Sequence, residues 1–254
     1  MELFDLSGKV ALITGSTKGI GKAIAKRLAD AGAAVVISSR NQDACDEVAA
    51  EINAAGGKAL AIACNINYKD QLQQLVEKTV STLGAIDVLV INAALNPFYG
   101  PSQEIPDQAF DKIMHANIGS AHRLCQLAIP GMAENGGGAV IIVSSIAGLK
   151  GSSVLGAYGI SKAADMQIAR NLAVEWGPKN IRVNCIAPGL IRTDFARALW
   201  ENPETYKATV SNYPLRRIGE PDEIAGAAVF LASPAGSFMT GQTMVIDGGG
   251  TITS

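Results

Sequence analysis

Tyr158 and Lys162 are spaced for proton transfer on a predicted helix. Residues at i and i+4 lie on one face of a helix, so the two side chains are expected to be neighbours. A tyrosine with a pKa of about 10 is a poor base at neutral pH, and a nearby ammonium group stabilises its phenolate form. Lowering that pKa by about three units requires roughly 4 kcal/mol, which two cations in a partly dry site can supply. The pair predicts a tyrosine that donates and accepts a proton.

Two adjacent serines precede this pair, at the end of a short apolar segment. Ala139–Val143 is predicted as a buried strand, and Ser144 and Ser145 follow it directly. Open sheets of parallel strands bind ligands at the carboxyl ends of their strands. A serine hydroxyl at that edge can donate a hydrogen bond to a substrate oxygen on which negative charge develops. Because a Y-x-x-x-K pair alone also occurs by chance on helix surfaces, the serines strengthen the hypothesis of a catalytic site.

A glycine-rich turn, TGSTKGIG at residues 14–21, lies near the N-terminus. Gly15, Gly19 and Gly21 permit a tight turn into a helix, whose first N–H groups and positive dipole end favour a pyrophosphate. The spacing G-x-x-x-G-x-G differs from the common G-x-G-x-x-G dinucleotide pattern. Its position between a predicted strand and a predicted helix favours a dinucleotide site. A turn required only for packing is the alternative.

The end of the second predicted strand bears on the choice of dinucleotide. NAD-binding sheets usually carry an acid there that holds the ribose hydroxyls, whereas this chain has the segment SSRN at residues 38–41. Arg40 can bind a 2′-phosphate in bidentate geometry, and Lys18 adds a second positive charge. We therefore expect NADP(H); the alternative is that Arg40 and Lys18 are solvated surface charges. The positive ring of the oxidised nicotinamide is then the second cation beside Tyr158.

Strand-like and helix-like segments alternate along the whole chain. The predicted strands are Lys9–Thr14, Ala34–Ser38, Ala59–Ala63, Asp87–Ile91, Ala139–Val143, Arg182–Ile186 and Met244–Ile246. The predicted helices are Ile20–Ala31, Gln42–Ala55, Lys69–Leu83, Asp107–Ile129 (ended by Pro130), Gly156–Trp176 and Asp222–Leu231. Such alternation is typical of a parallel sheet with right-handed crossovers and helices on both faces. We expect an α/β protein with a doubly wound Rossmann fold of about seven strands.

One domain over residues 1–254 is expected, since no linker, low-complexity segment or repeat divides the chain. One insertion, residues 192–217, follows the sixth predicted strand and contains apolar side chains such as Phe195 and Trp200. This segment is interpreted as a substrate lid, because mobile loops over a site often carry such side chains. A pair of ordinary surface helices is the alternative.

Composition and charge exclude several classes of protein. The net charge of −2 gives no basic footprint for nucleic acid or an anionic membrane. The apolar stretches are too short to span a bilayer, and MELFDLSGKV at the N-terminus lacks a signal-peptide pattern. The cysteines form no C-x-x-C pair, so buried free thiols are expected instead of disulfides or a zinc site. We expect a cytoplasmic protein without nucleic-acid or membrane partners and without a metal.

Six ordered motifs resemble the short-chain dehydrogenase/reductase family over essentially the whole chain. They are TGSTKGIG at 14–21, INAA at 91–94, the helix residue Asn117, SS at 144–145, YGISK at 158–162 and APGLIRT at 187–193. The resemblance implies hydride transfer between a nicotinamide and a carbonyl or alcohol carbon. It also implies a homotetramer.

The resemblance assigns a role to each catalytic side chain. Ser145 would polarise the substrate oxygen, and Tyr158 would transfer the proton. Lys162 would bind the nicotinamide ribose and lower the pKa of Tyr158. Asn117 would kink its helix and hold a water that links Lys162 to solvent, and Asn92 would fix the turn after the fourth strand beside the cofactor.

The expected cofactor contacts are spread over the ends of several strands. They are Gly15, Ser16, Thr17, Lys18, Gly19, Ile20, Gly21, Ser39, Arg40, Asn65, Ile66, Asn92, Ala93, Tyr158, Lys162, Pro188, Gly189, Ile191 and Thr193. The chain departs from the family pattern at Ile91 and Ala94, where an asparagine and a glycine are usual, and at Asn65, where an aspartate is usual. An asparagine can still accept a hydrogen bond from the adenine amino group through its carbonyl.

Within the family, INAALNPFYG and APGLIRTDFARALW look most like an NADPH-dependent carbonyl reductase subgroup that reduces retinal and aromatic or aliphatic ketones. We therefore expect an NADP(H)-dependent reductase of a hydrophobic ketone or aldehyde. Three alternatives stay open: a 3-oxoacyl-thioester reductase, an NAD-dependent secondary alcohol dehydrogenase, and a non-catalytic NADP(H)-binding regulator. Arg40 argues against the second, and the presence of both Tyr158 and Lys162 argues against the third.

Overall fold

Seven parallel strands form one sheet in the order β3-β2-β1-β4-β5-β6-β7 in the computed structural model, which describes residues 2–253. The strands are β1 (Val10–Thr14), β2 (Ala34–Ser38), β3 (Lys58–Ala61), β4 (Val88–Ile91), β5 (Gly138–Val143), β6 (Ile181–Pro188) and β7 (Thr243–Ile246). The winding direction reverses between β1 and β4, and doubly wound sheets bind ligands at such a switch point. The predicted fold class and its seven strands are confirmed.

The register of β1 places alternate side chains on opposite faces of the sheet. Leu12 lies beside Val36 of β2 and Leu89 of β4, and all three belong to the core on one face. Ile13 lies beside Ile37 and belongs to the core on the other face. Strands buried on both faces are continuous aliphatic runs, which explains the sequences of β2 and β4.

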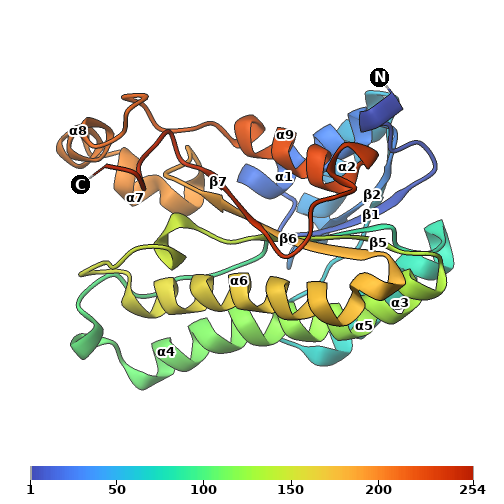
Figure 1. Ribbon diagram of the computed structural model, residues 1–254, viewed down its shortest axis with the longest axis horizontal. Helices are drawn as coiled ribbons and strands as arrows, with labels where there is room; N and C mark the ends of the chain where they lie inside the picture. Colours follow the sequence, from blue (N-terminus) through green and yellow to red (C-terminus); the bar gives the residue numbers. More distant parts are fainter. Residues whose placement is uncertain (1, 254) are drawn as a thin grey trace.

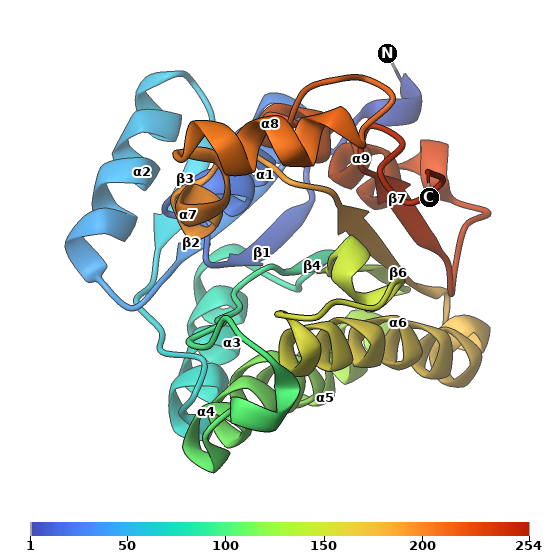
Figure 2. The same cartoon turned by 90° about the vertical axis from the view of Figure 1, so that its left-hand side faces the viewer.

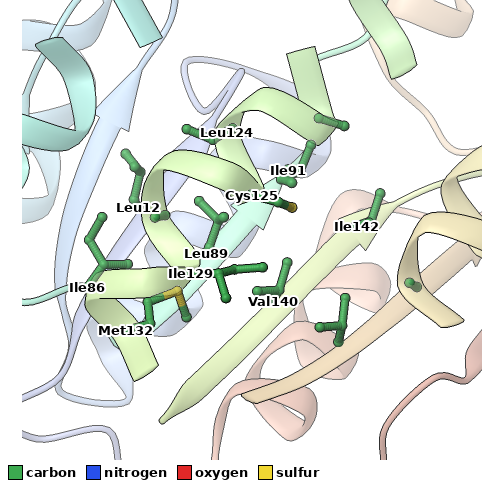
Figure 3. Close-up of a cluster of buried hydrophobic side chains, with 14 of the residues drawn as sticks. Leu12, Ile86, Leu89, Ile91, Leu124, Cys125, Ile129, Met132, Val140 and Ile142 are labelled. Carbon is green, nitrogen blue, oxygen red and sulfur yellow. The ribbon is translucent and has the colours of Figure 1, made fainter. Parts of the chain in front are cut away.

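Two layers of helices cover the sheet (Figures 1 and 2). One face carries α1 (Gly19–Asp30), α2 (Gln42–Ala54) and α9 (Pro221–Ala232), and the other carries α3 (Lys69–Leu83), α5 (Ser120–Glu134) and α6 (Gly156–Trp176). Figure 3 shows the core that contains Leu12, in which Leu124, Ile129 and Met132 of α5 lie with Leu89 and Val140 of the sheet. Within residues 2–253, no helix combines the length and apolarity needed to cross a membrane.

The prediction of one helix over Asp107–Ile129 is wrong in two respects. This part of the chain consists of α4 (Asp107–Ile113), a π-helical segment (Met114–Gly119) and α5 (Ser120–Glu134). Pro130 also lies inside α5 and does not end it. Pro130 and Gln126, whose carbonyl loses its usual helical partner, are both exposed, so water can satisfy that carbonyl. Ile129 and Met132 are buried against the sheet, and this packing keeps the chain helical.

The insertion over residues 192–217 contains a short turn and two helices. These are the 3-10 turn Asp194–Ala196, α7 (Arg197–Trp200) and α8 (Pro203–Ser211). Figure 1 shows α7 and α8 in orange at one end of the molecule, the same end at which α6 begins. The insertion therefore lies near Tyr158, which belongs to the first turn of α6.

Candidate active site

A cavity of about 550 Å³ opens at the carboxyl edge of the sheet, beside the switch point. Gly15, Ser39, Asn92 and Ser144 each follow a strand directly and all four line it. Pockets for small molecules and cofactors usually have volumes of about 300–1,000 Å³. The predicted cofactor residues that line the cavity are Gly15, Thr17, Lys18, Gly19, Ile20, Ser39, Arg40, Asn65, Ile66, Asn92, Ala93, Tyr158, Lys162 and Thr193.

The glycine turn has no room for a side chain at Gly21, where the chain passes close to Gly15. A Cβ on Gly21 would lie 2.3 Å from the Gly15 carbonyl oxygen and 2.5 Å from Asn92 Nδ2. Gly15 and Gly19 have φ angles of +65° and +55°, in the left-handed region that favours glycine. Lys18, the residue before α1, has no acceptor with which to cap the helix, so the first amides of α1 are available to an anion. The turn therefore fits a pyrophosphate.

Side-chain hydrogen bonds hold this turn to its neighbours. Asn92 Nδ2 donates to the carbonyls of Thr14 and Gly15, both at 3.0 Å. Ser16 Oγ donates to Ile13 O and accepts from the Ser38 amide, each at 2.8 Å, so it joins the ends of β1 and β2. Asn92 thus holds the glycine turn after β1; its predicted role in the turn after β4, beside the cofactor, stays a prediction.

The two predicted phosphate-binding cations differ in their surroundings. Arg40 is exposed and lines the cavity, and within residues 2–253 it forms no ion pair. Lys18 Nζ lies 3.8 Å from Asp194 Oδ2 of the insertion. Part of the Lys18 charge is therefore neutralised by the protein, and Arg40 is the stronger anchor for an anionic group.

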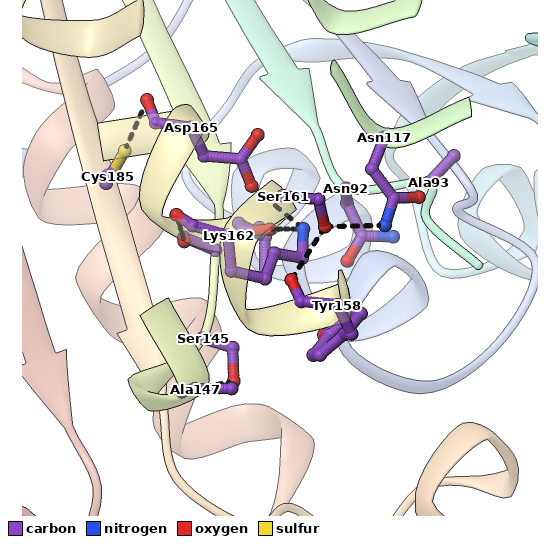
Figure 4. Close-up of polar contacts among 12 residues, drawn as sticks. Asn92, Ala93, Asn117, Ser145, Ala147, Tyr158, Ser161, Lys162, Asp165 and Cys185 are labelled. Carbon is purple, nitrogen blue, oxygen red and sulfur yellow. Dashed lines mark hydrogen bonds and ion pairs between the residues drawn. The ribbon is translucent and has the colours of Figure 1, made fainter. Parts of the chain in front are cut away.

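Tyr158 and Lys162 lie together at the wall of the cavity, as their spacing predicts (Figure 4). Lys162 Nζ lies 5.7 Å from the centre of the Tyr158 ring. It donates to Val143 O, at the end of β5, at 3.1 Å. The long α6 and the end of β5 therefore fix the position of the ammonium group.

The pKa of Tyr158 is raised above its ordinary value, mainly because the phenol is buried. Lys162 and Ser145 lower this pKa, whereas the charge of Asp165 raises it further. Lys162 thus acts in the expected direction, but the protein groups together do not depress the pKa. The expectation from the Lys162 charge was incomplete because it left out burial and Asp165.

Asp165 is a site residue that the sequence analysis missed. Its Oδ2 accepts a hydrogen bond from Lys162 Nζ at 2.9 Å, and only 1% of its side chain is exposed. Burial raises the pKa of Asp165, and the Lys162 charge opposes this. The available signal was its i+3 spacing from Lys162, which places a carboxylate on the same helix face.

Asn117 lies in the π-helical segment and is buried. Its Oδ1 accepts from the Leu95 amide at 2.9 Å, and its Nδ2 donates to Leu95 O and to Ser161 Oγ, each at 3.0 Å. Both N–H donors of the side chain are thus used. Asn117 ties the loop after β4 to α6, and the water relay toward Lys162 stays a prediction.

The two serines after β5 differ in their bonding. Ser144 Oγ donates to Lys162 O at 2.8 Å, so this hydroxyl fastens α6 to the sheet. Ser145 Oγ accepts from the Ala147 amide at 3.1 Å and, as a neighbour of Tyr158, lowers the pKa of that phenol. Ser144 lines the cavity and Ser145 does not, but among the hydrogen bonds of the described residues only the Ser144 proton has an acceptor, so the Ser145 hydroxyl can still donate.

Five predicted cofactor residues do not line the cavity. They are Ser16, Gly21, Pro188, Gly189 and Ile191. Pro188 and Ile191 are buried, and a Cβ on Gly189 would lie 2.8 Å from Asp247 Cα. These residues shape the walls from behind. A motif locates a turn in the chain, but it does not say which side chains of that turn point into the cavity.

The insertion reaches Tyr158 through Phe195. The Phe195 and Tyr158 ring centres are 6.1 Å apart, and Phe195 is 58% exposed. Leu95 lines the same cavity, so its mouth is partly apolar. A more open depression of about 610 Å³ lies behind the insertion, beside Trp200 and Lys22, but it contains neither Tyr158 nor Lys162. The smaller cavity is therefore the candidate active site, because Tyr158 and Lys162 line it.

The site can bind a dinucleotide and move a proton. The glycine turn and Arg40 suit phosphates, and Tyr158 with Lys162 suits general acid–base catalysis. Within residues 2–253, no group of three or more His, Cys, Asp or Glu side chains is arranged to hold a metal. The four cysteines of the described chain are buried and free.

Comparison with known proteins finds similarity along almost the whole chain. A family model described as enoyl-(acyl carrier protein) reductase matches residues 15–251. Dehydrogenase/reductase SDR family member 4 of Bos taurus is 43% identical over 244 residues, which cover 96% of this chain and 88% of that protein. The Homo sapiens protein of the same name is 42% identical with the same coverage.

Solved structures are also similar to this chain along nearly its whole length. A 7α-hydroxysteroid dehydrogenase complexed with NADH and 7-oxo glycochenodeoxycholic acid has a TM-score of 0.94 at 41% identity, covering 98% of this chain and 96% of that one. A gluconate 5-dehydrogenase from Burkholderia cenocepacia J2315, in complex with NADP and tartrate, has a TM-score of 0.96 at 31% identity, covering 100% and 99%. One complex holds NADH and the other NADP, so similarity alone does not select the cofactor.

Proposed function

Since the chain belongs to the short-chain dehydrogenase/reductase family, we propose that it is an NADP(H)-dependent enzyme that reduces a ketone or aldehyde, or oxidises the matching alcohol. The observation that carries this proposal is the Tyr158–Lys162 pair, 5.7 Å from ring centre to Nζ, at the wall of a cavity that begins at the glycine turn. When bound, the nicotinamide supplies the hydride.

Three residues in and beside the cavity have different roles in the proposed reaction. Tyr158 donates its phenolic proton to the carbonyl oxygen during reduction and takes it back during oxidation. Ser145 donates a hydrogen bond to the same oxygen, which stabilises the charge that develops there. Lys162 uses two of its three donors on Val143 O and Asp165, and the third is available to a ribose hydroxyl.

The preference for NADP(H) is supported by the end of β2. Arg40 offers a planar pair of donors to a 2′-phosphate, and no acidic side chain occupies residues 38–41, where it would repel that phosphate. The first amides of helix α1 would bind the pyrophosphate of the cofactor.

A hydrophobic carbonyl substrate is supported by the mouth of the cavity. Leu95 and Phe195 lie on this side, and the Phe195 ring is 6.1 Å from that of Tyr158. An aromatic or aliphatic ketone matches these side chains better than a polyhydroxylated sugar, which would leave hydroxyl groups without partners.

The test is a substrate panel with purified protein. NADPH and NADH are offered in parallel with aromatic ketones, aliphatic ketones, retinal and a 3-oxoacyl thioester. We expect NADPH consumption with a hydrophobic ketone or aldehyde, and a fall in kcat of roughly 10²–10⁴-fold in Tyr158→Phe. Equal rates in the wild type and Tyr158→Phe would remove the catalytic assignment, and a preference for the thioester would change the substrate class.

We also propose that the protein assembles as a homotetramer. Val174 on α6 and Phe238 and Ile252 near the C-terminal strand are large apolar side chains that are mostly exposed. A second copy of the chain would remove them from water, which favours association. Sedimentation of the wild type beside Val174→Asp checks this: a smaller species in the variant is expected, and a monomeric wild type would contradict it.

A further inference from the structure

Asp165 is buried beside the catalytic lysine, in a position that costs energy. It lies one turn after Lys162 on α6, 1% exposed, with Oδ2 2.9 Å from Nζ (Figure 4). Moving a carboxylate out of water costs several kcal/mol, which only a well-placed partner offsets. Lys162 is that partner, and the proposed reaction gives Asp165 no direct contact with substrate.

The Lys162 side chain is held from two sides. Its ammonium donates to Val143 O at 3.1 Å and to Asp165 at 2.9 Å. Its backbone is fixed as well, since Ser144 Oγ donates to Lys162 O at 2.8 Å and a Cβ on Gly148 would lie 2.6 Å from Lys162 C. Of these contacts, only the one with Asp165 supplies a charge opposite to that of the ammonium.

We propose that Asp165 is a positioning residue, whose carboxylate holds the Lys162 side chain against the end of β5 and keeps its ammonium group charged in a buried place. This inference rests on the proposed role of Lys162 toward the cofactor. Burial by itself favours the neutral amine, so a lysine in this position needs an anion to remain a cation.

The groups around the pair support this assignment. Burial lowers the pKa of Lys162, but the charge and hydrogen bond of Asp165, with a contribution from Tyr158, hold that pKa above its ordinary value. Cys125 of α5 and Cys185 of β6 also face Asp165. Burial raises the pKa of each thiol to about 12, so both remain uncharged at neutral pH. Asp165 is the carboxyl group hydrogen-bonded to Lys162, whose charge and hydrogen bond in turn oppose the burial that raises the pKa of Asp165.

The first experiment follows NADPH binding against pH by fluorescence titration in Asp165→Asn, Asp165→Glu and the wild type. In Asp165→Asn we expect the alkaline loss of affinity to begin at least about one pH unit lower, because the unpaired lysine gives up its proton earlier. Asp165→Glu keeps the charge and should restore most of the wild-type profile. Glu175→Gln, which removes an exposed carboxylate from the same helix, should change nothing. An unchanged profile in Asp165→Asn overturns the proposal.

A second measurement does not depend on function and covers the case in which Asp165→Asn fails to fold. Denaturant unfolding is compared for Lys162→Met and for the double variant Lys162→Met with Asp165→Asn. Removing one partner of a buried pair is more harmful than removing both, so the double variant should be at least as stable as Lys162→Met. A double variant that is less stable would mean that Asp165 acts independently of Lys162, against the proposal.

The proposed roles of Lys162 and Asp165 can be tested separately. If Lys162→Met binds NADPH like the wild type, the proposed role of Lys162 toward the cofactor is wrong, while the unfolding comparison still decides whether the two residues are coupled. If Lys162→Met loses NADPH affinity and Asp165→Asn does not, only the role of Asp165 is wrong.

Discussion

The two walls of the active-site cavity are built in different ways. The wall from the glycine turn is made of backbone in contact with backbone, with Gly21 so close to Gly15 that a single methyl group would collide. The wall from the insertion is made of exposed side chains, such as Phe195, joined by surface ion pairs including Arg192–Glu220 and Lys18–Asp194. Exposed ion pairs contribute about 0–1 kcal/mol each. The wall from the glycine turn is thus fixed by packing, whereas the wall from the insertion can change its conformation at little cost in free energy.

Gly21→Ala tests the packed wall and should have the largest effect. The added Cβ would lie 2.3 Å from the Gly15 carbonyl oxygen, which belongs to rigid backbone. We expect a loss of about 1–3 kcal/mol in the free energy of unfolding and loss of NADPH binding. Denaturant unfolding and calorimetric titration measure the two effects. Gly226→Ala, where a Cβ meets nothing, is the matched control, and similar losses in both variants would contradict the comparison.

Arg40→Asp tests the charge at the rim of the same wall. Replacing a donor pair with a carboxylate removes the proposed partner of the 2′-phosphate and adds repulsion. NADPH affinity should fall roughly 100-fold, equivalent to about 2.7 kcal/mol, with little change for NADH. Lys18→Ala should have a smaller effect, since Asp194 already neutralises part of the Lys18 charge. Equal losses of affinity for both cofactors in Arg40→Asp would rule out the assignment of Arg40.

Phe195→Ala tests the substrate wall, where we propose that residues 192–217 act as a lid. The KM for an apolar ketone should rise roughly tenfold, because the loss of one apolar contact costs about 1–3 kcal/mol of binding. Stability should change by less than about 0.5 kcal/mol, since the side chain is 58% exposed. NADPH affinity should stay as in the wild type. Phe4→Ala, which removes a partly exposed phenylalanine near the N-terminus, is the control. A lower stability in Phe195→Ala would indicate that Phe195 has a structural role instead.

A change of pH should have the smallest effect, measured on the rate of reduction. Because the pKa of Tyr158 is raised, the phenol keeps its proton throughout the neutral range, and reduction needs that proton. The kcat for reduction should therefore vary little between about pH 6 and pH 9. Oxidation needs the phenolate, so its rate should rise with pH over the same range. Steady-state rates in both directions check this, and a reduction rate that falls above neutral pH would show that bound cofactor overrides the protein groups.

The sheet and its helices could be predicted because their signals are local. Aliphatic runs such as Val88–Ile91 are strands buried on both faces, and the alternation with amphipathic helices implies a parallel sheet. The behaviour at Pro130 could not be predicted in the same way. The rule that proline ends a helix concerns the backbone alone, while packing of Ile129 and Met132 against the sheet decides the outcome here.

The site could be predicted where a motif fixes the backbone. It was less predictable where burial determines a pKa or where the direction of a side chain matters. Tyr158 and Lys162 lie together because helical spacing requires it. The direction of the Tyr158 pKa depends on desolvation and on Asp165, which become visible only when the chain is folded. The five cofactor residues that do not line the cavity illustrate the same limit, since spacing does not determine which way a side chain points.

The strand order has a consequence for synthesis of the chain on the ribosome. β4 pairs with β1 on one side, but its other neighbour is β5, which begins only at Gly138, after α4 and α5 have been made. A nascent chain that has emerged only as far as α5 therefore presents the free edge of Val88–Ile91, four aliphatic residues without charge. Unpaired apolar edges join to other chains. Synthesis of β5 thus covers this edge of β4, and the outer edge of β5 is covered in turn only when β6 has been made.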